Sequence, residues 1–149
     1  MEKLTVLLPF VEFPPEHTCD GGDVSPPLTL QGLRAGSVAV WALNPFEPGC
    51  SFTTWIIWNI DPLPLIPKGI PKVPVVDRPL RARQGTNDFG ETGYRGPCPP
   101  PGTIHRLLFR VYGLDRLIDL EPGASKHEFV EALKGHVVQF GTTMAMYTR

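Results

Sequence analysis

Three stretches of the chain carry the hydrophobic patterns of β-strands. Residues 37–43 and 52–60 are rich in β-branched and aromatic side chains and are apolar on both faces, which is typical of central strands. Between residues 104 and 112 apolar and polar side chains alternate instead, which places His105 on the same face as Leu107. We expect this third strand to turn that face to the core, with the histidine at its entrance.

One helix is predicted near residues 125–134. Ser125 and Glu128 form a capping box, in which each side chain satisfies a free backbone amide of the first turn. Apolar residues then recur at helical spacing, and Gly135 marks the expected end. We expect residues 137–147 to form a mixed, partly extended tail that packs back on the domain.

Two proline-rich segments interrupt these elements. Residues 61–79 contain six prolines, too many for a helix or a central strand, and predict a long surface excursion. Residues 85–105 combine prolines, which fix the backbone, with glycines, which let the main chain approach a ligand closely. We expect this second segment to build a small surface pocket, and a purely structural loop is the alternative.

Composition and charge narrow the classes of function. The 149 residues suit a single domain, residues 1–149, and the formal net charge of -1 provides no basic field for nucleic acid or an anionic membrane. The 18 prolines accompany an apolar fraction of 42%, so we expect ordered loops rather than disorder. The apolar run at the start is too short for a signal peptide, and none reaches the roughly 18 residues of a membrane span. We expect a soluble, cytoplasmic protein.

Nucleophilic catalysis has one candidate pair. Cys98 lies seven residues before His105, and a thiolate beside an imidazole is a familiar nucleophile. Prolines enclose the cysteine, however, and no helix N-terminus close in sequence would lower its pKa. The sequence also lacks the Gly-x-Ser-x-Gly elbow of serine hydrolases. We therefore expect no enzymatic activity.

Metal and disulfide frameworks are not indicated. The three cysteines, Cys19, Cys50 and Cys98, include no CxxC pair, which favours structural or unreactive thiols. A Cys19–Cys98 bridge stays open, because both cysteines lie in segments expected near the pocket. Residues 20–23 resemble the start of a cation loop but lack the later oxygen ligands, so we expect a turn. No metal ion and no cofactor are expected.

Several motifs resemble those of the phosphatidylethanolamine-binding protein family, in its bacterial and archaeal branch. They are Asn87-Asp88-Phe89-Gly90, Gly93-Tyr94, Gly96-Pro97-Cys98-Pro99-Pro100, Gly102 and His105-Arg106, joined by Cys19-Asp20-Gly21, Trp55, Asn59 and Tyr147-x-Arg149. The resemblance covers nearly the whole chain. It implies a mainly β fold of two antiparallel sheets with Greek-key topology, one or two short helices, and a small pocket for phosphate, phosphorylethanolamine or similar anions.

The resemblance also implies which residues bind a ligand. The expected set is Asn44, Pro48, Thr54, Tyr94, Gly96, Pro99, Pro100 and His105. The chain departs from the family at three polar positions, where Asn44 replaces an aspartate, Thr54 a histidine and Leu107 a tyrosine. A cis peptide bond is expected between Glu47 and Pro48. Because the exchanges remove charge and hydrogen-bond donors, we expect a more apolar pocket that binds anions weakly.

Three functional hypotheses follow. The first is a non-enzymatic binding protein whose pocket recognises a small anionic or phosphorylated group. Arg95 and Arg106 could add charge at its rim, but ordinary solvated side chains are the favoured interpretation for both. The second is a protein-interaction module that acts through residues 61–79 and 85–101, because long, rigid loops lose little entropy on docking. The resemblance implies that its partner would be a kinase or protease that it inhibits. An enzyme using Cys98 or His105 is the third and least favoured.

Overall fold

The structure is a computed structural model that describes residues 1–45 and 52–149. Its strands are β1 (Glu2–Lys3), β2 (Thr5–Leu7), β3 (Leu28–Gln31), β4 (Ser37–Asn44), β5 (Phe52–Ile60), β6 (Leu65–Ile66), β7 (Val75–Val76), β8 (Ala82–Gln84), β9 (Ile104–Leu114) and β10 (Val137–Thr148). Helix α1 spans Lys126–Leu133, and a short 3-10 turn spans Pro15–His17. The mainly β fold is thereby confirmed. Within the described ranges no helix has the length and apolar character needed to cross a bilayer.

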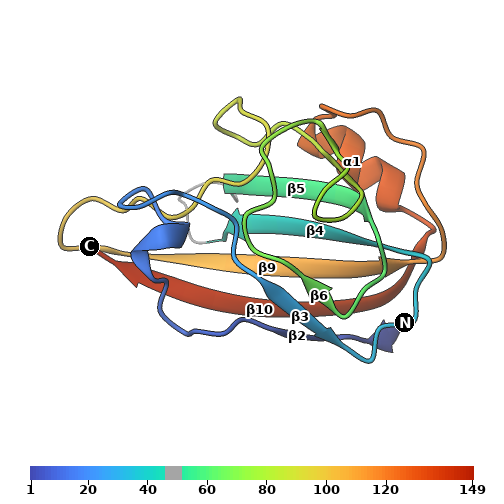
Figure 1. Ribbon diagram of the computed structural model, residues 1–149, viewed down its shortest axis with the longest axis horizontal. Helices are drawn as coiled ribbons and strands as arrows, with labels where there is room; N and C mark the ends of the chain where they lie inside the picture. Colours follow the sequence, from blue (N-terminus) through green and yellow to red (C-terminus); the bar gives the residue numbers. More distant parts are fainter. Residues whose placement is uncertain (46–51) are drawn as a thin grey trace.

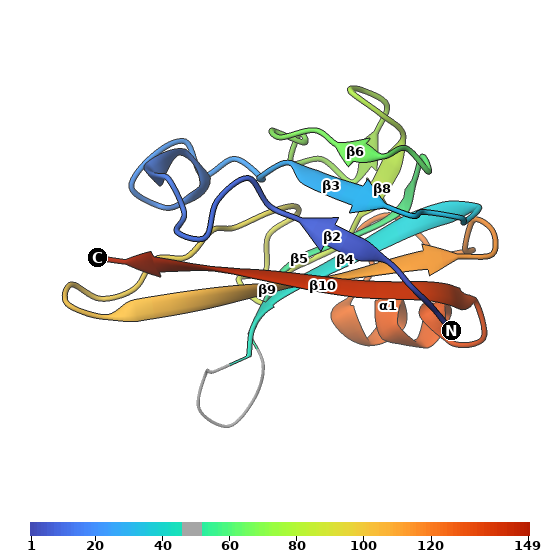
Figure 2. The same cartoon turned by 90° about the horizontal axis from the view of Figure 1, so that it is seen from below.

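The strands form a large sheet of seven and a small sheet of three (Figures 1 and 2). The large sheet has the order β1-β10-β9-β4-β5-β8-β7, and the small sheet the order β2-β3-β6. The four long strands β4, β5, β9 and β10 therefore lie side by side at the centre of the large sheet. The expectation of wholly antiparallel sheets is wrong at one place, because β1 pairs in parallel with β10. The Greek-key connection stays a prediction.

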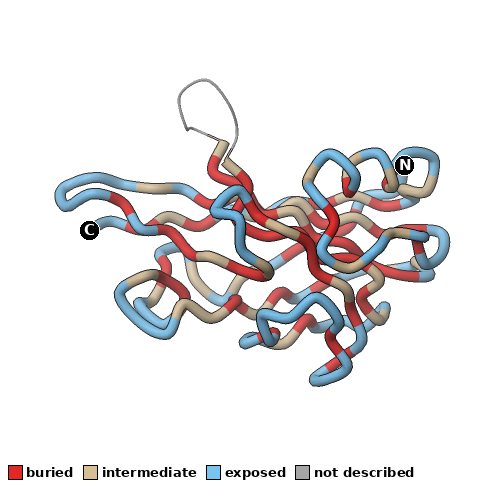
Figure 3. Tube along the Cα trace, turned by 90° about the horizontal axis from the view of Figure 1, so that it is seen from above, coloured by how far each residue is buried: buried red, intermediate tan, exposed pale blue. Residues whose placement is uncertain are grey.

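The main core lies between the two sheets, and Figure 3 shows the buried segments running through the interior. Along β9, Leu107 and Phe109 are buried while Arg110 is partly exposed, as the alternating pattern predicts. Strands β4 and β5 are buried on both faces because α1 covers the outer face of the sheet, where Trp58 lies 5.8 Å from Phe129 between ring centroids. The two apolar faces predicted for β4 and β5 thus pack on different elements, one toward the small sheet and the other on α1.

The helix near residues 125–134 is present as predicted, whereas the tail at residues 137–147 is not. The capping box is confirmed, since the Ser125 hydroxyl accepts from the Glu128 amide (3.2 Å) and the Glu128 carboxylate from the Ser125 amide (3.0 Å). The expectation for residues 137–147 is wrong, because this stretch is the long regular strand β10. Its mixed pattern, which includes Gly141, hid a strand that is stabilised by pairing with β9 along most of its length, with a register shift between Val137 and Gln139.

Residues 61–79 are more ordered than the long surface excursion that their prolines predicted. They include β6 and β7, and Ile66 is buried in the main core. The buried side chain of Gln84, on β8, donates hydrogen bonds to the backbone carbonyls of Pro71 (2.7 Å) and Val73 (3.0 Å). This buried amide therefore fixes the path of a segment whose prolines leave it few backbone donors of its own.

Candidate functional site

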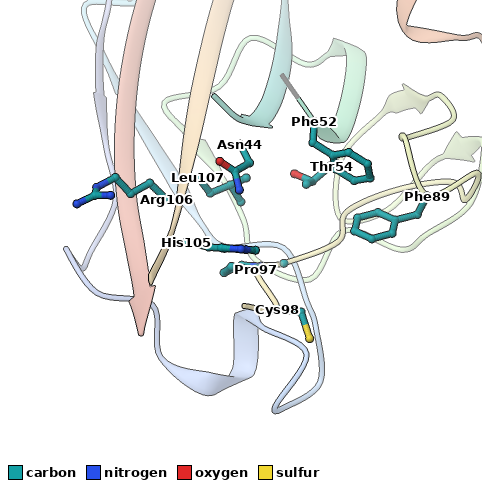
Figure 4. A pocket seen from close by; sticks show the side chains of 10 residues that line it. Asn44, Phe52, Thr54, Phe89, Pro97, Cys98, His105, Arg106 and Leu107 are labelled. Carbon is teal, nitrogen blue, oxygen red and sulfur yellow. The ribbon is translucent and has the colours of Figure 1, made fainter. Parts of the chain in front are cut away.

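A cavity of about 240 Å³ lies where three central strands meet the loop of residues 85–103. The register of the large sheet pairs Asn44, at the end of β4, with Phe52, at the start of β5. Strand β9 runs beside β4 and contributes His105 and Leu107 to the cavity near its start (Figure 4). The described lining residues are Asn44, Phe52, Thr54, Phe89, Gly96, Pro97, Cys98, His105, Arg106 and Leu107.

Three polar side chains, those of Asn44, Thr54 and His105, lie around the cavity in Figure 4. The hydroxyl of Thr54 donates a hydrogen bond to the backbone carbonyl of Ala42 (3.3 Å), so it offers a ligand its lone pairs rather than its proton. His105 is partly exposed and presents ring nitrogens that can donate or accept. The polar side of the pocket thus centres on one imidazole.

The opposite side of the pocket is aromatic. Phe52 and Phe89 meet edge to face, with ring centroids 4.8 Å apart at an interplanar angle of 77°. The guanidinium of Arg95 lies 4.4 Å from the centroid of the Phe89 ring. The turn that presents this ring is held by Asn87, whose side-chain oxygen accepts from the amides of Phe89 (2.9 Å) and Glu91 (3.1 Å). We call Phe52 and Phe89 the aromatic wall.

Gly96, Pro97 and Cys98 form the floor of the pocket. Residues 94–98 pack on residues 17–23, an arrangement that we call the floor clamp. The Gly96 amide donates to the Asp23 carboxylate (2.7 Å), and Asp23 itself has a positive φ of 56°. A side chain cannot be added at residue 96, because its Cβ would lie 2.0 Å from the carbonyl oxygen of His17. Glycine at this position is therefore a requirement of close backbone packing.

Tyr94 belongs to the floor clamp. Its ring packs edge-on against Trp55 (centroids 5.6 Å apart), and its hydroxyl donates to the His17 carbonyl (2.7 Å). Burial raises the pKa of Tyr94 well above its ordinary value of 10.0, and the negative charge of Asp23 raises it further. The phenol consequently stays neutral and continues to donate its hydrogen bond.

A disulfide joins Cys19 to Cys98, with Cα atoms 5.4 Å apart. The favoured prediction of unpaired thiols is wrong for these two cysteines, and the bridge that was left open is present. Because Cys98 also lines the cavity, the bond attaches the pocket to the floor clamp. Its sulfur is no nucleophile while the disulfide is intact, so the suggested pairing with His105 is unavailable in this state. Cys50 lies outside the described residues.

Four of the eight predicted site residues line the cavity. Asn44, Thr54 and His105 contribute side chains, and Gly96 contributes backbone. Pro48, with its expected cis peptide bond, lies outside the described residues. A role in ligand binding stays a prediction for each of them.

The other predicted residues support the pocket from behind. Tyr94, Pro99 and Pro100 are absent from the described lining. The Pro99 carbonyl accepts a hydrogen bond from Arg149 (3.4 Å), while that of Pro100 accepts from the Thr103 amide (3.1 Å). Their motif therefore shapes a turn and anchors the C-terminal residue.

The two arginines considered as rim charges direct their side chains elsewhere. Figure 4 shows the Arg106 side chain extending away from His105, although the residue borders the cavity. Arg95 forms ion pairs with Asp23 (Nε–Oδ2, 3.2 Å) and with Glu91. Its charge is thus directed to carboxylates outside the pocket. Within the described ranges, no group of three or more His, Cys, Asp or Glu residues could hold a metal ion.

Sequence reasoning missed the aromatic wall and the role of Asp23. Phe89 had a detectable signal, because it is a large apolar residue in an Asn/Gly turn, and its side chain remains 45% exposed. Phe52 was assigned only to a strand, and Asp23 only to a turn. Their roles depend on the contacts that residues 85–98 make with distant parts of the chain.

The fold and the site together define a class: a two-sheet β protein with a small pocket at the ends of its central strands, closed by a glycine- and proline-rich loop. A family model for phosphatidylethanolamine-binding protein matches residues 7–148. The chain therefore belongs to the phosphatidylethanolamine-binding protein family, which confirms the resemblance seen in its motifs.

Individual relatives agree with this assignment. A UPF0098 protein of Pyrococcus horikoshii is 46% identical over 139 residues, which cover 91% of this chain and 70% of the relative. Among solved structures, a Chlamydia trachomatis protein described as a phosphatidylethanolamine-binding protein homolog has a TM-score of 0.86 and 27% identity, covering 100% of this chain and 99% of the other. YbcL of E. coli, described as a member of the mammalian family, has a TM-score of 0.85 and 26% identity, with 99% of each chain covered.

The disulfide is expected to stabilise the fold substantially. Replacing Cys19 and Cys98 together by serine should lower the free energy of unfolding by about 2–4 kcal/mol, because the bond cross-links the unfolded chain over a long loop. Urea denaturation with and without reductant measures this. The natural chain and a Cys50→Ser control should lose stability on reduction, whereas the double variant should not respond. An unchanged midpoint for the reduced natural chain would contradict the prediction.

Proposed function

We propose that this chain acts by binding rather than by catalysis, and that its pocket takes a small anionic group against His105. The observation that carries the proposal is the imidazole at the edge of a formed cavity, beside the buried amide of Asn44. An imidazole N–H donates hydrogen bonds to oxyanions, and in its protonated form the ring also carries a positive charge. Membership of the phosphatidylethanolamine-binding protein family supports the same role.

The chemistry of the lining favours binding over turnover. Apart from Arg106, His105 is the one titratable side chain among the described lining residues, since Cys98 is oxidised. General acid–base and nucleophilic mechanisms use a second positioned group to activate or orient the first. The described pocket provides a single imidazole with no carboxylate or thiolate beside it, which suits recognition of a group that is held and released unchanged.

The anion proposal predicts a specific response of His105. Titration with phosphate and with phosphorylethanolamine should shift the His105 ring resonances in NMR spectra, and His105→Gln should weaken binding roughly tenfold or more, as expected when a charge-assisted hydrogen bond is lost. His127→Gln is the matched control, because His127 is exposed on α1. Resonances of His105 that stay constant up to tens of millimolar ligand would refute the proposal.

A second candidate function is protein inhibition through residues 61–79, a segment that carries exposed apolar side chains on a fixed backbone. Leu63 is 48% exposed between Pro62 and Pro64, and the Pro64 carbonyl accepts a hydrogen bond from the Leu30 amide of β3 (2.8 Å). A preordered segment loses little conformational entropy on docking. An exposed leucine that precedes a proline suits the specificity pocket of a chymotrypsin-like protease, while the proline makes the bond after it a poor site for cleavage.

This second candidate predicts measurable inhibition of chymotrypsin. The natural chain should slow hydrolysis of a chromogenic peptide, and Leu63→Asp should weaken that inhibition at least tenfold because the apolar anchor is lost. Leu117→Asp is the control, since Leu117 is 63% exposed on the connection between β9 and α1. Equal inhibition by the two variants, or none by the natural chain, would argue against this function.

A further inference from the structure

The pocket is larger and less polar than a bare inorganic anion requires. Its volume of about 240 Å³ is roughly eight times the 30 Å³ that one water molecule occupies in the liquid. Phe52, Phe89, Pro97 and Leu107 contribute apolar lining. A phosphate seated against His105 would leave most of this apolar surface in contact with water. The unused part of the cavity can accommodate an additional group of about six to ten heavy atoms.

The charges around the cavity are arranged unfavourably for a multiply charged ion. Arg95 is directed to the carboxylates of Asp23 and Glu91, and Asp23 accepts the Gly96 amide. The Thr54 hydroxyl gives its proton to the Ala42 carbonyl, so its lone pairs would repel an oxyanion placed beside it. Transfer of a dianion from water is therefore poorly compensated here. A ligand avoids this desolvation cost when its anionic group stays at the mouth of the pocket and only an apolar group enters the cavity.

The aromatic wall is positioned before any ligand arrives. Phe89 is held by its edge contact with Phe52 and by the Arg95 guanidinium stacked on its ring. The ring is nevertheless 45% exposed, so a ligand can still remove apolar surface from water. Aromatic rings at this distance favour a further ring in an edge-to-face or offset arrangement. The wall is thus a preformed surface for a flat apolar group.

We propose that the pocket takes an anion that carries a flat aromatic group, such as an aryl phosphonate or aryl carboxylate. The ring lies against Phe52 and Phe89, and the anionic head lies at His105. This inference rests on the proposed anion-binding function and specifies its ligand class. Phe89 is accordingly a specificity-determining residue. It distinguishes anions by the shape and apolar surface of the group that they carry, whereas the single histidine responds only to their charge.

The test compares phosphate, methylphosphonate and phenylphosphonate on the natural chain, by NMR titration of the His105 and Phe89 resonances. Phenylphosphonate should bind about tenfold or more tightly than methylphosphonate, since both share one head group and differ in the ring. In Phe89→Ala this preference should fall close to one. Phe140→Ala is the matched control, because Phe140 packs on Tyr112 away from the pocket, and it should keep the preference.

Each outcome separates this inference from the function on which it rests. If the two phosphonates bind equally while His105 responds to both, the aromatic specificity is wrong and anion binding stands. If His105 responds to none of the three ligands, anion binding fails and the inference fails with it. Phe89→Leu provides a second test in case the alanine variant does not fold. A preference for phenylphosphonate that persists in both variants would overturn the role of the aromatic wall.

Discussion

The close packing of residues 94–98 on residues 17–23 is the constraint on which the pocket depends. The backbone at Gly96 approaches the His17 carbonyl so closely that no Cβ fits between them, and its amide is held by the Asp23 carboxylate. The Tyr94 hydroxyl and the Cys19–Cys98 disulfide fix the same two segments on either side of this contact. Hydrogen bonds, a covalent bond and steric exclusion therefore all specify one position for the pocket floor.

The floor clamp also connects the pocket to the large sheet. The Tyr147 hydroxyl, near the end of β10, donates to the Asp20 carboxylate, and Arg149 forms an ion pair with the same residue (3.1 Å). Burial and the charge of Asp23 raise the pKa of Tyr94 in the same clamp, so its phenol stays neutral. The last residues of the chain thus brace the segment that carries the disulfide. A loop rich in glycine and proline gains its order from these distant contacts.

The division of polar groups is the physical basis of the proposed selection by shape more than by charge. Asp23 and Arg95, two charged residues of the floor clamp, hold the Gly96 amide and the Phe89 ring. The rest of the described lining presents one imidazole and a largely apolar surface. Asn44, Thr54 and Leu107 contribute to this character, because they line the cavity with an amide, a hydroxyl and an apolar side chain, none of which is charged.

Local patterns sufficed to predict the elements whose residues repeat regularly. The alternation along β9 placed His105 on the core side, and the capping box at Ser125 located the helix. Strand β10 was missed because glycine and threonine interrupt its pattern, and its stability comes from pairing with β9. The motif around Gly96 located the pocket, but motif residues such as Tyr94 proved to be structural. Asp23 meets Gly96 across 73 residues of sequence, a contact that no local pattern encodes.

Hydrogen exchange at the Gly96 amide tests the central claim, that the floor clamp preforms the pocket without a ligand, most directly. In the ligand-free protein, this amide should exchange as slowly as the amides between β4 and β5, because its release requires the clamp to open. The amide of Gly90, which bonds within an exposed turn, provides the internal reference for fast exchange. Exchange at Gly96 as fast as at Gly90 would contradict the account, since the floor would then be open much of the time.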